Sequence, residues 1–310
     1  MDNLCHTLVG AAFGEAGLKQ KTRFGNATLM IAANLPDVDV LVFATYTPSV
    51  VFRRGWTHGI VAQLLLPIVL TAAMATLGRS GRTRRDGPPL SIPWLLGLSY
   101  IGVYSHVFLD YLNNYGVRLL APIDWRWIYG DTLFIVDPWL WMVLGVGVWL
   151  ARRRQSLRPA HVSLAIAACY VAVMLVGARA SRDIVADAWR SAHGTLPSAL
   201  MVGPVPITPF VRDIVIDAGD HYETGRFSWA GRSVTLDPMT VPKNSANPAV
   251  ADARRSVAFR AFLVWSRFPY FAVEPASEGT RVTVRDMRFG GAIGGRFAVS
   301  VITKRAPSTF

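Results

Sequence analysis

The first 180 residues alternate long apolar stretches with short basic runs, and the rest of the chain does not. A helix needs about 20 apolar residues to cross a bilayer. Four stretches approach that length: residues 59–78, 92–112, 133–150 and 161–178. Two weaker candidates precede them, residues 4–18 and 27–45, and the second contains acidic residues. These two can be re-entrant or buried against the bundle, because unpaired carboxylates in lipid are costly. We therefore expect an α-helical polytopic membrane domain with four to six segments.

The pattern changes near residue 180. From residue 196 onward, short β-prone runs alternate with turn residues, at 212–217, 233–236, 258–265, 270–274, 281–289 and 296–303. Residues 237–252 are typical of a loop. We expect the membrane domain to cover residues 1–180, a helical linker to follow at 181–195, and a small soluble β-rich domain to occupy 196–310.

Charge supports a membrane protein. Only 17% of the residues are charged and 52% are apolar, whereas soluble domains carry about 25% charged residues. This composition excludes a disordered chain and a coiled coil. The net charge is +12, but 11 of the 16 basic residues among the first 180 lie in three runs, at 19–23, 79–85 and 152–158. Because the runs separate apolar stretches, they follow the positive-inside rule and do not form the single patch that binds nucleic acid.

The positive-inside rule gives a topology. We expect the three basic runs in the cytoplasm, with both termini and the β-rich domain on the outer side. Membrane lipid is then the expected partner and nucleic acid is not, and the sequence indicates no protein partner. The two cysteines lie far apart in apolar segments, so neither a disulfide framework nor a cysteine zinc motif is available.

Ionisable residues inside the apolar stretches are the candidates for chemistry. His106 and Asp110 form an H-x-x-x-D pair on a predicted membrane helix, and this spacing puts both side chains on one face. Asn113 and Asn114 continue that face. A histidine and a carboxylate so placed can bind a metal together or fix each other's orientation. Ionisable groups within a span are costly and by default functional.

Further ionisable residues reach the same depth on the outer side: His6, Asp37, Asp39 and His58. Nitrogen and oxygen ligands without sulfur favour zinc, or else manganese or another first-row divalent metal. We predict a divalent-metal site with ligands drawn from the six residues His6, Asp37, Asp39, His58, His106 and Asp110.

Structural alternatives exist for several of these residues. Asp37, which follows Pro36, can cap a helix. His6 can be a buried histidine with satisfied hydrogen bonds, and His58 can be a histidine at the membrane interface. Asp137 precedes Pro138, which is the usual arrangement of a helix N-cap.

Two arginines and an asparagine are candidates for substrate binding. Arg53 and Arg54 lie four to five residues before His58 and can bind an anionic substrate group or lipid headgroups. Asn114 is the third candidate.

The chain resembles the bacterial membrane-bound metal-dependent hydrolase family, the DUF457 or YdjM-like proteins. The resemblance covers roughly residues 1–155 and rests on MDNLCHTLVGAAFGEAGL, ANLPDVDVL, RRGWTHGI, YSHVFLDYLNNYGVRLLAP and FIVDPWLW. The β-rich region is similar to a C-terminal extension of some members. Membership implies a multi-pass protein of the bacterial inner membrane with hydrolase activity, and it supplies no substrate.

A more distant likeness concerns the ligand order. Along the chain, the candidate ligands occur in the order Asp, His and then an H-x-x-x-D pair. This order is similar to that of the first metal site of zinc phospholipase C and P1 nuclease. The likeness implies Asp37 or Asp39, then His58, His106 and Asp110, as ligands. It implies His6 for a neighbouring metal. That group also uses a later His and an H-x-x-x-E as ligands, and no counterpart of these ligands follows Asp110 here. We therefore expect one metal ion, or two with an incomplete second shell.

These observations lead to a functional hypothesis. We expect a hydrolase that acts at the outer membrane face on a phosphoester or lipid-linked substrate, through a metal-activated water. Whichever of Asp37 and Asp39 is not a ligand would serve as general base. One alternative is a non-enzymatic scaffold or regulator, in which a structural metal or a His–Asp network staples the bundle. An ion-coupled transporter is less favoured, because the candidates gather on one side of the membrane and no inverted halves are apparent.

Overall fold

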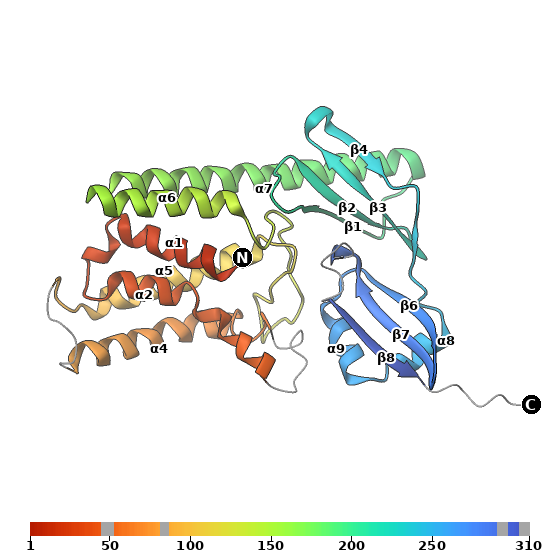
Figure 1. Ribbon diagram of the computed structural model, residues 1–310, viewed down its shortest axis with the longest axis horizontal. Coiled ribbons are helices and arrows are strands. Elements are labelled where there is room, and N and C mark those ends of the chain that lie inside the picture. Colours follow the sequence, from red (N-terminus) through yellow and green to blue (C-terminus); the bar gives the residue numbers. More distant parts are fainter. Residues whose placement is uncertain (45–52, 81–86, 290–296, 304–310) are drawn as a thin grey trace, which may run out of the picture. The chain divides into compact units, whose positions relative to one another are not determined.

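The computed structural model describes residues 1–44, 53–80, 87–289 and 297–303, and these residues form two compact units (Figure 1). The helical unit comprises Met1–Leu41, Arg53–Ala178 and Pro204–Pro209. The β unit comprises most of the remaining described residues, chiefly Arg179–Gly203 and the chain from Phe210 onward.

Within the described part of the chain, the shorter helical segments of this unit are α1 (Asn3–Glu15), a 3₁₀ turn (Leu18–Gln20), α2 (Gly25–Ala32), a 3₁₀ segment (Leu35–Ala44) and α6 (Pro138–Arg154). The unit also contains α4 (Ile60–Arg79), α5 (Ile92–Tyr111) and the first part of α7 (Arg158–His193). Among the described residues, only α4, α5 and α7 are long and apolar enough to cross a membrane.

The expected four to six spans are therefore not confirmed. The stretch at 133–150 is helical only from Pro138, because Asp137 caps α6 by accepting hydrogen bonds from the backbone N–H groups of Trp139 and Leu140, each at 3.0 Å. The N-cap predicted for Asp137 is thus confirmed. The stretch at 4–18 and the described part of 27–45, which ends at residue 44, form shorter helical pieces interrupted by turns.

The three long helices carry exposed apolar side chains. Leu65 and Val69 on α4 are 53% and 61% exposed, and Val173 and Val176 on α7 are 63% and 66% exposed. Large apolar surfaces of this kind are stable in a hydrocarbon environment and costly in water. These helices support a membrane location for the helical unit.

Two glycines let α2 pack closely between α1 and α5. A Cβ added at Gly10 of α1 would lie 2.8 Å from the backbone oxygen of Leu29. A Cβ added at Gly102 of α5 would lie 2.4 Å from the Cβ of Ala32. Real Cβ atoms do not approach so closely, so both positions require glycine to keep α2 at this distance.

Two of the basic runs share one end of the helical unit. Glu15, at the end of α1, accepts a hydrogen bond from Arg152 Nε at 2.8 Å and pairs with Lys19. The hydroxyl of Thr22 accepts a hydrogen bond from the backbone N–H of Ser91 at 2.9 Å. Residues from the runs at 19–23 and 152–158 therefore meet at one carboxylate. The run at 79–85 lies mostly outside the described residues, but Ser91, which follows it in the chain, contacts the first run.

The β unit has two antiparallel sheets. The first has the strand order β1 (Ala199–Pro204), β2 (Val211–Asp217), β3 (His221–Ser228) and β4 (Ser233–Leu236), and β5 (Val241–Pro242) also pairs with β3. The second consists of β6 (Pro269–Ala276), β7 (Gly279–Asp286) and β8 (Ala298–Thr303). The end of α7 packs its apolar face, which includes Val185 and Trp189, against the first sheet.

Several sequence expectations for this unit need correction. Residues 258–265, expected as a strand, belong to the helix α9 (Val257–Trp265). Its buried residues Phe259, Phe262 and Trp265 follow helical and not alternating spacing. The loop expected at 237–252 contains β5 and the start of α8 (Pro248–Ala253). The helix expected at 181–195 is present as far as His193, where it is the continuation of α7.

A buried carboxylate ties the second sheet to the preceding loop. Asp286, at the end of β7, accepts hydrogen bonds from Ser266 Oγ and the Arg267 backbone N–H, both at 2.7 Å, and from Arg288 Nε at 2.9 Å. Burial by itself would raise the pKa of Asp286, but the Arg288 charge and the hydrogen bonds hold this pKa below its ordinary value. Asp286 therefore stabilises the fold in its ionised form.

Asp286→Asn should destabilise this part of the β unit by about 3 kcal/mol, because it leaves the buried Arg288 guanidinium without its counter-charge. Hydrogen exchange of β6 and β7 peptides in the full-length protein measures the loss. Asp252→Asn is the control, since Asp252 is half-exposed and lies 3.7 Å from Arg255. The Asp286 contribution is present above the unfolded pKa of about 3.9 and is lost as the pH falls through the folded value. Equal exchange in wild type and Asp286→Asn would contradict the assignment.

Candidate metal centre

Four buried side chains in the helical unit bring their ligand atoms together. Asp37 comes from the 3₁₀ segment, His58 from the turn before α4, and His106 and Asp110 from α5. One nitrogen or carboxylate oxygen of each lies within 4.8 Å of all the others. This group can hold a metal ion.

The separations suit tetrahedral coordination. His58 Nε2 lies 3.1 Å from His106 Nε2, and Asp110 Oδ2 lies 3.3 and 3.6 Å from these two atoms. Asp37 Oδ1 is more distant, at 4.0 and 3.9 Å from the same nitrogens. Ligands at about 2.0–2.1 Å from a tetrahedral zinc ion lie roughly 3.3 Å apart. Three of the four atoms match this spacing, and Asp37 needs only a small shift.

The other ring nitrogen of each histidine is engaged, and this fixes the tautomers. His106 Nδ1 lies 2.8 Å from the backbone oxygen of Ala33, which can only accept, so this nitrogen donates. The Thr57 hydroxyl donates to Asp39 Oδ2 at 3.0 Å and so accepts from His58 Nδ1, also at 3.0 Å. Both Nε2 atoms then present lone pairs to each other at 3.1 Å. In this pair of tautomers, neither Nε2 can donate to the other, and both are available as ligands to one metal ion.

Burial supports the ligand form of His58. The side chain is fully buried, and loss of solvation lowers its pKa below the ordinary value. A neutral imidazole is the form that binds a metal ion. Asp37 Oδ1 is also buried and accepts no hydrogen bond from the residues that the structure describes, although Arg53 Nη2 lies 3.5 Å away.

Asp39, a predicted ligand or base, lies behind His58 and outside the four-residue group. Its Oδ2 accepts hydrogen bonds from Thr57 and, at 2.7 Å, from the backbone N–H of Arg54. Asp39 thereby orients the His58 ring through Thr57, as the carboxylate does in carboxylate–histidine–metal arrangements.

His6, another predicted ligand, also lies outside the four-residue group. Its ring stacks on His106 with centroids 3.8 Å apart, and its Nε2 is 3.3 Å from Asp110 Oδ1. The Met1 amine contacts the same oxygen. Asp110 therefore faces the four-residue group with Oδ2 and His6 with Oδ1.

The two arginines occupy different environments. The Arg54 side chain is 5% exposed, and its Nη2 lies 2.9 Å from Asp110 Oδ2 while Nη1 donates to Asn113 Oδ1 at 3.1 Å. Arg53 is 22% exposed and lies 3.5 Å from Asp37 Oδ1 and 3.6 Å from Asp39 Oδ1. Asn114 is buried. Arg53 is thus the more accessible cation at the site.

Sequence reasoning did not assign Thr57, Ala33 or Gly102 to the site. Thr57 and Ala33 fix the two histidine tautomers. Gly102 allows Ala33 to approach, because an added Cβ would lie 2.9 Å from the Ala33 backbone nitrogen. Only Gly102 carried a signal, since it precedes His106 by one helical turn on the same helix.

Comparisons with known proteins agree with the helical unit. The model of the family described as YdjM inner membrane protein matches residues 1–181. The uncharacterized protein YfhP of Bacillus subtilis (strain 168) is 21% identical over 300 residues, which cover 93% of this chain and 87% of that protein. No solved structure matches the chain. The likeness to zinc phospholipase C and P1 nuclease stays a prediction.

Removing either histidine should abolish metal binding, because each supplies one converging Nε2. We expect about one divalent ion per wild-type chain and close to none in His58→Ala and His106→Ala, as measured by elemental analysis of detergent-purified protein. The control is His161→Ala, which replaces an exposed histidine at the start of α7. A folded wild type that takes up no zinc or manganese after add-back would contradict the site.

Gly102→Ala should weaken metal binding without removing any ligand. The new Cβ would displace the α2 end and the Ala33 oxygen that orients His106, and such outer contacts are worth about 10- to 100-fold in affinity. Gly97→Ala is the matched control on the same helix, since nothing lies within 4 Å of a Cβ there. Competition with a chelator measures both, and equal affinities would show that the Ala33 contact does not position His106.

Proposed function

Because this chain belongs to the YdjM inner membrane protein family and buries a convergent Asp, His, His and Asp group, we propose that it is a membrane-bound metal-dependent hydrolase. The proposed substrate is a phosphoester, and a lipid-linked phosphoester is the one we favour. The observation that supports this most directly is the pair of Nε2 lone pairs held 3.1 Å apart beside two carboxylates. Asp37, His58, His106 and Asp110 would hold the ion, which would supply a water of lowered pKa as nucleophile at neutral pH.

The donor set favours zinc. Two imidazole nitrogens and two carboxylate oxygens in a tetrahedral arrangement suit zinc, and manganese is the second choice. His6 and Asp110 Oδ1 lie 3.3 Å apart and are the candidates for a second ion.

The chain's own residues divide the remaining work. Asp37 is a ligand, and Asp39 orients His58 through Thr57. Asp39 Oδ1 accepts no hydrogen bond from any described residue, so this oxygen is the one that takes a proton as general base. Arg53, which is partly exposed beside both carboxylates, binds the anionic part of the substrate. Arg54 neutralises Asp110 from the buried side, and Asn114, which is buried, is the further candidate for substrate binding.

The site belongs to the outer membrane face in this proposal. His58 precedes α4 and Asp110 ends α5, whereas the basic runs lie beside the opposite ends of these helices, after Arg79 and before Ile92. The positive-inside rule places the basic ends in the cytoplasm. The metal-binding ends and the β unit are then extracytoplasmic in a multi-pass protein.

One observation favours a second function. All four ligands are buried protein groups, and closed four-ligand sites are typical of structural zinc, whereas catalytic sites keep a position open. The group can therefore be a structural metal site that holds the helices of a non-enzymatic scaffold together. The most distant ligand atom is Asp37 Oδ1, 3.9–4.0 Å from the two histidine Nε2 atoms. The hydrolase proposal requires either that Asp37 leave its coordination position or that the ion take a fifth ligand.

Asp39→Asn separates the two functions. The amide keeps the shape and most hydrogen bonds but cannot take a proton, so hydrolysis should fall by roughly 10²-fold or more with metal content and unfolding temperature nearly unchanged. A phosphoester panel and thermal unfolding of the purified protein are the measurements.

Asp124→Asn is the control, because Asp124 is a partly exposed carboxylate paired with Arg126 elsewhere in the helical unit. A wild type that holds stoichiometric metal but cleaves no phosphoester would refute the hydrolase. Loss of stability in Asp39→Asn would then favour the scaffold.

A further inference from the structure

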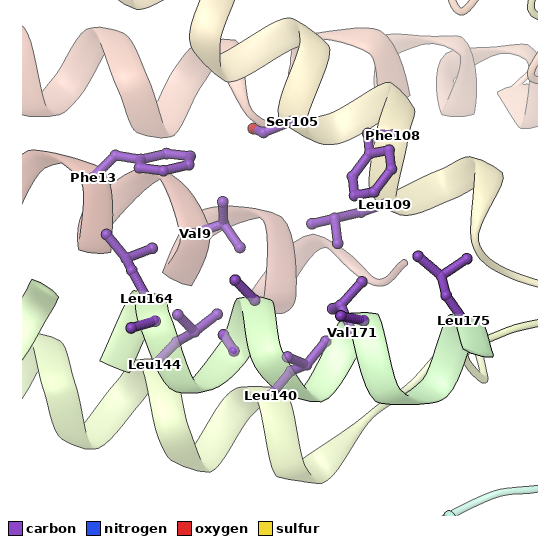
Figure 2. A pocket seen from close by; sticks show the side chains of 14 residues that line it. Val9, Phe13, Ser105, Phe108, Leu109, Leu140, Leu144, Leu164, Val171 and Leu175 are labelled. Atoms are coloured by element: carbon purple, nitrogen blue, oxygen red, sulfur yellow. The ribbon is translucent and has the colours of Figure 1, made fainter. Parts of the chain in front are cut away.

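An apolar groove of about 610 Å³ runs between α1, α5, α6 and α7 in the helical unit. Figure 2 shows side chains of α1 and α5, among them Val9 and Leu109, pointing toward those of α7. Small side chains of α7 also line it, at Ala165, Ala168 and Ala172. All lining residues belong to the helical unit.

The lining selects an apolar occupant. Ser105 is the only lining residue with a polar side chain, and its hydroxyl donates to the Gly102 backbone oxygen at 2.8 Å. A polar ligand group in the groove would lose its hydration without gaining a hydrogen bond, which costs free energy. A hydrocarbon chain meets no such penalty.

The length of the groove fits one leaflet of a bilayer. Its lining on α7 runs from Leu164 to Leu175, eleven residue steps, or about 16 Å at the helical rise. This is about half of the roughly 30 Å hydrocarbon core. Both α5 and α7 are long and apolar enough to cross a membrane, so the groove opens toward lipid tails. A partner helix would instead follow α7 over the whole span.

One end of the groove adjoins the metal centre. Leu109 and Ser105 line the groove and directly precede Asp110 and His106. Val9 lies one helical turn after His6 on α1. In Figure 2, Leu109 lies near Leu175, away from the end marked by Phe13 and Leu164. A chain in the groove would therefore hold its polar head beside the metal ligands.

We propose that this groove binds one long hydrocarbon chain of a membrane lipid, with the lipid headgroup toward the metal centre. The orientation rests on the proposed hydrolase function, because it presents the headgroup phosphoester to the site. The chain-binding step itself does not depend on bound metal.

Photocrosslinking in nanodiscs tests the groove directly. The probe is a phospholipid whose palmitoyl chain carries a diazirine, and the readout is adduct mapping on the full-length protein. We expect wild-type adducts on the lining residues of α1 and α7, at yields above those on exposed Val173 and Val176. Ala168→Phe should fill the groove and reduce these adducts at least about tenfold, because several methylene contacts are lost.

Cys169→Phe is the matched control, since it adds the same ring at the next, exposed position outside the lining, and it should leave the adducts unchanged. Equal adduct yields in wild type and Ala168→Phe, or adducts spread evenly over the outer faces, would overturn the proposal. Dimer crosslinks through the groove in place of lipid adducts would overturn it in favour of a second copy.

A metal-free variant keeps the two proposals distinguishable. His106→Ala should retain the lipid adducts, because His106 does not line the groove. If groove adducts persist while wild type cleaves no phosphoester, the groove proposal holds and the hydrolase fails. If wild type cleaves a soluble short-chain phosphoester but forms no groove adducts, the hydrolase holds and the groove proposal is wrong.

Discussion

The carboxylate of Asp110 is the constraint on which the helical unit depends. A fully buried charge on an apolar helix is costly unless surrounding groups compensate it. Here Arg54, His58 and His106 approach one oxygen at 2.9, 3.3 and 3.6 Å, and His6 approaches the other at 3.3 Å. These residues come from α1, α5 and the turn before α4. Compensation of one charge therefore fixes the relative positions of segments that are distant in the sequence.

Backbone geometry supports this polar core. Gly10 and Gly102 let α2 lie close to both neighbours, and this brings the Ala33 oxygen to within 2.8 Å of His106. The same packing sets the start of the 3₁₀ segment that carries Asp37 and Asp39. The small residue Gly102 therefore acts on the site indirectly: it brings the Ala33 oxygen to His106 Nδ1, which leaves Nε2 of this histidine available to a ligand.

The sequence predicts the composition of the site better than its internal order. The H-x-x-x-D pair is readable because a helix places residues i and i+4 on one face. Asp37 and Asp39 cannot be assigned from sequence, because two residues in a 3₁₀ turn point in widely different directions and only tertiary packing decides which faces the histidines. Thr57 gives no signal, since a hydroxyl next to a histidine is common. In the β unit, alternating strands such as residues 212–217 are readable, whereas α9 was missed because its buried aromatic residues, such as Phe259 and Phe262, also suit a strand.

The four candidate ligands are not held equally firmly by their neighbours. Asp110 is held by Arg54, and both histidines are held through their second nitrogens. Asp37 is held less firmly: its Oδ1 accepts no hydrogen bond from any described residue, and its partner Arg53 is the partly exposed arginine. A set of three ligands held by hydrogen bonds or ion pairs, with one carboxylate held only by a longer ion pair, differs from a closed structural site in which every ligand is fixed. Because Asp37 lies beside the accessible Arg53, an anionic group that pairs with Arg53 would weaken the hold on Asp37. In the proposed hydrolase, Asp37 would therefore be the ligand that gives up its coordination position when an anionic substrate pairs with Arg53.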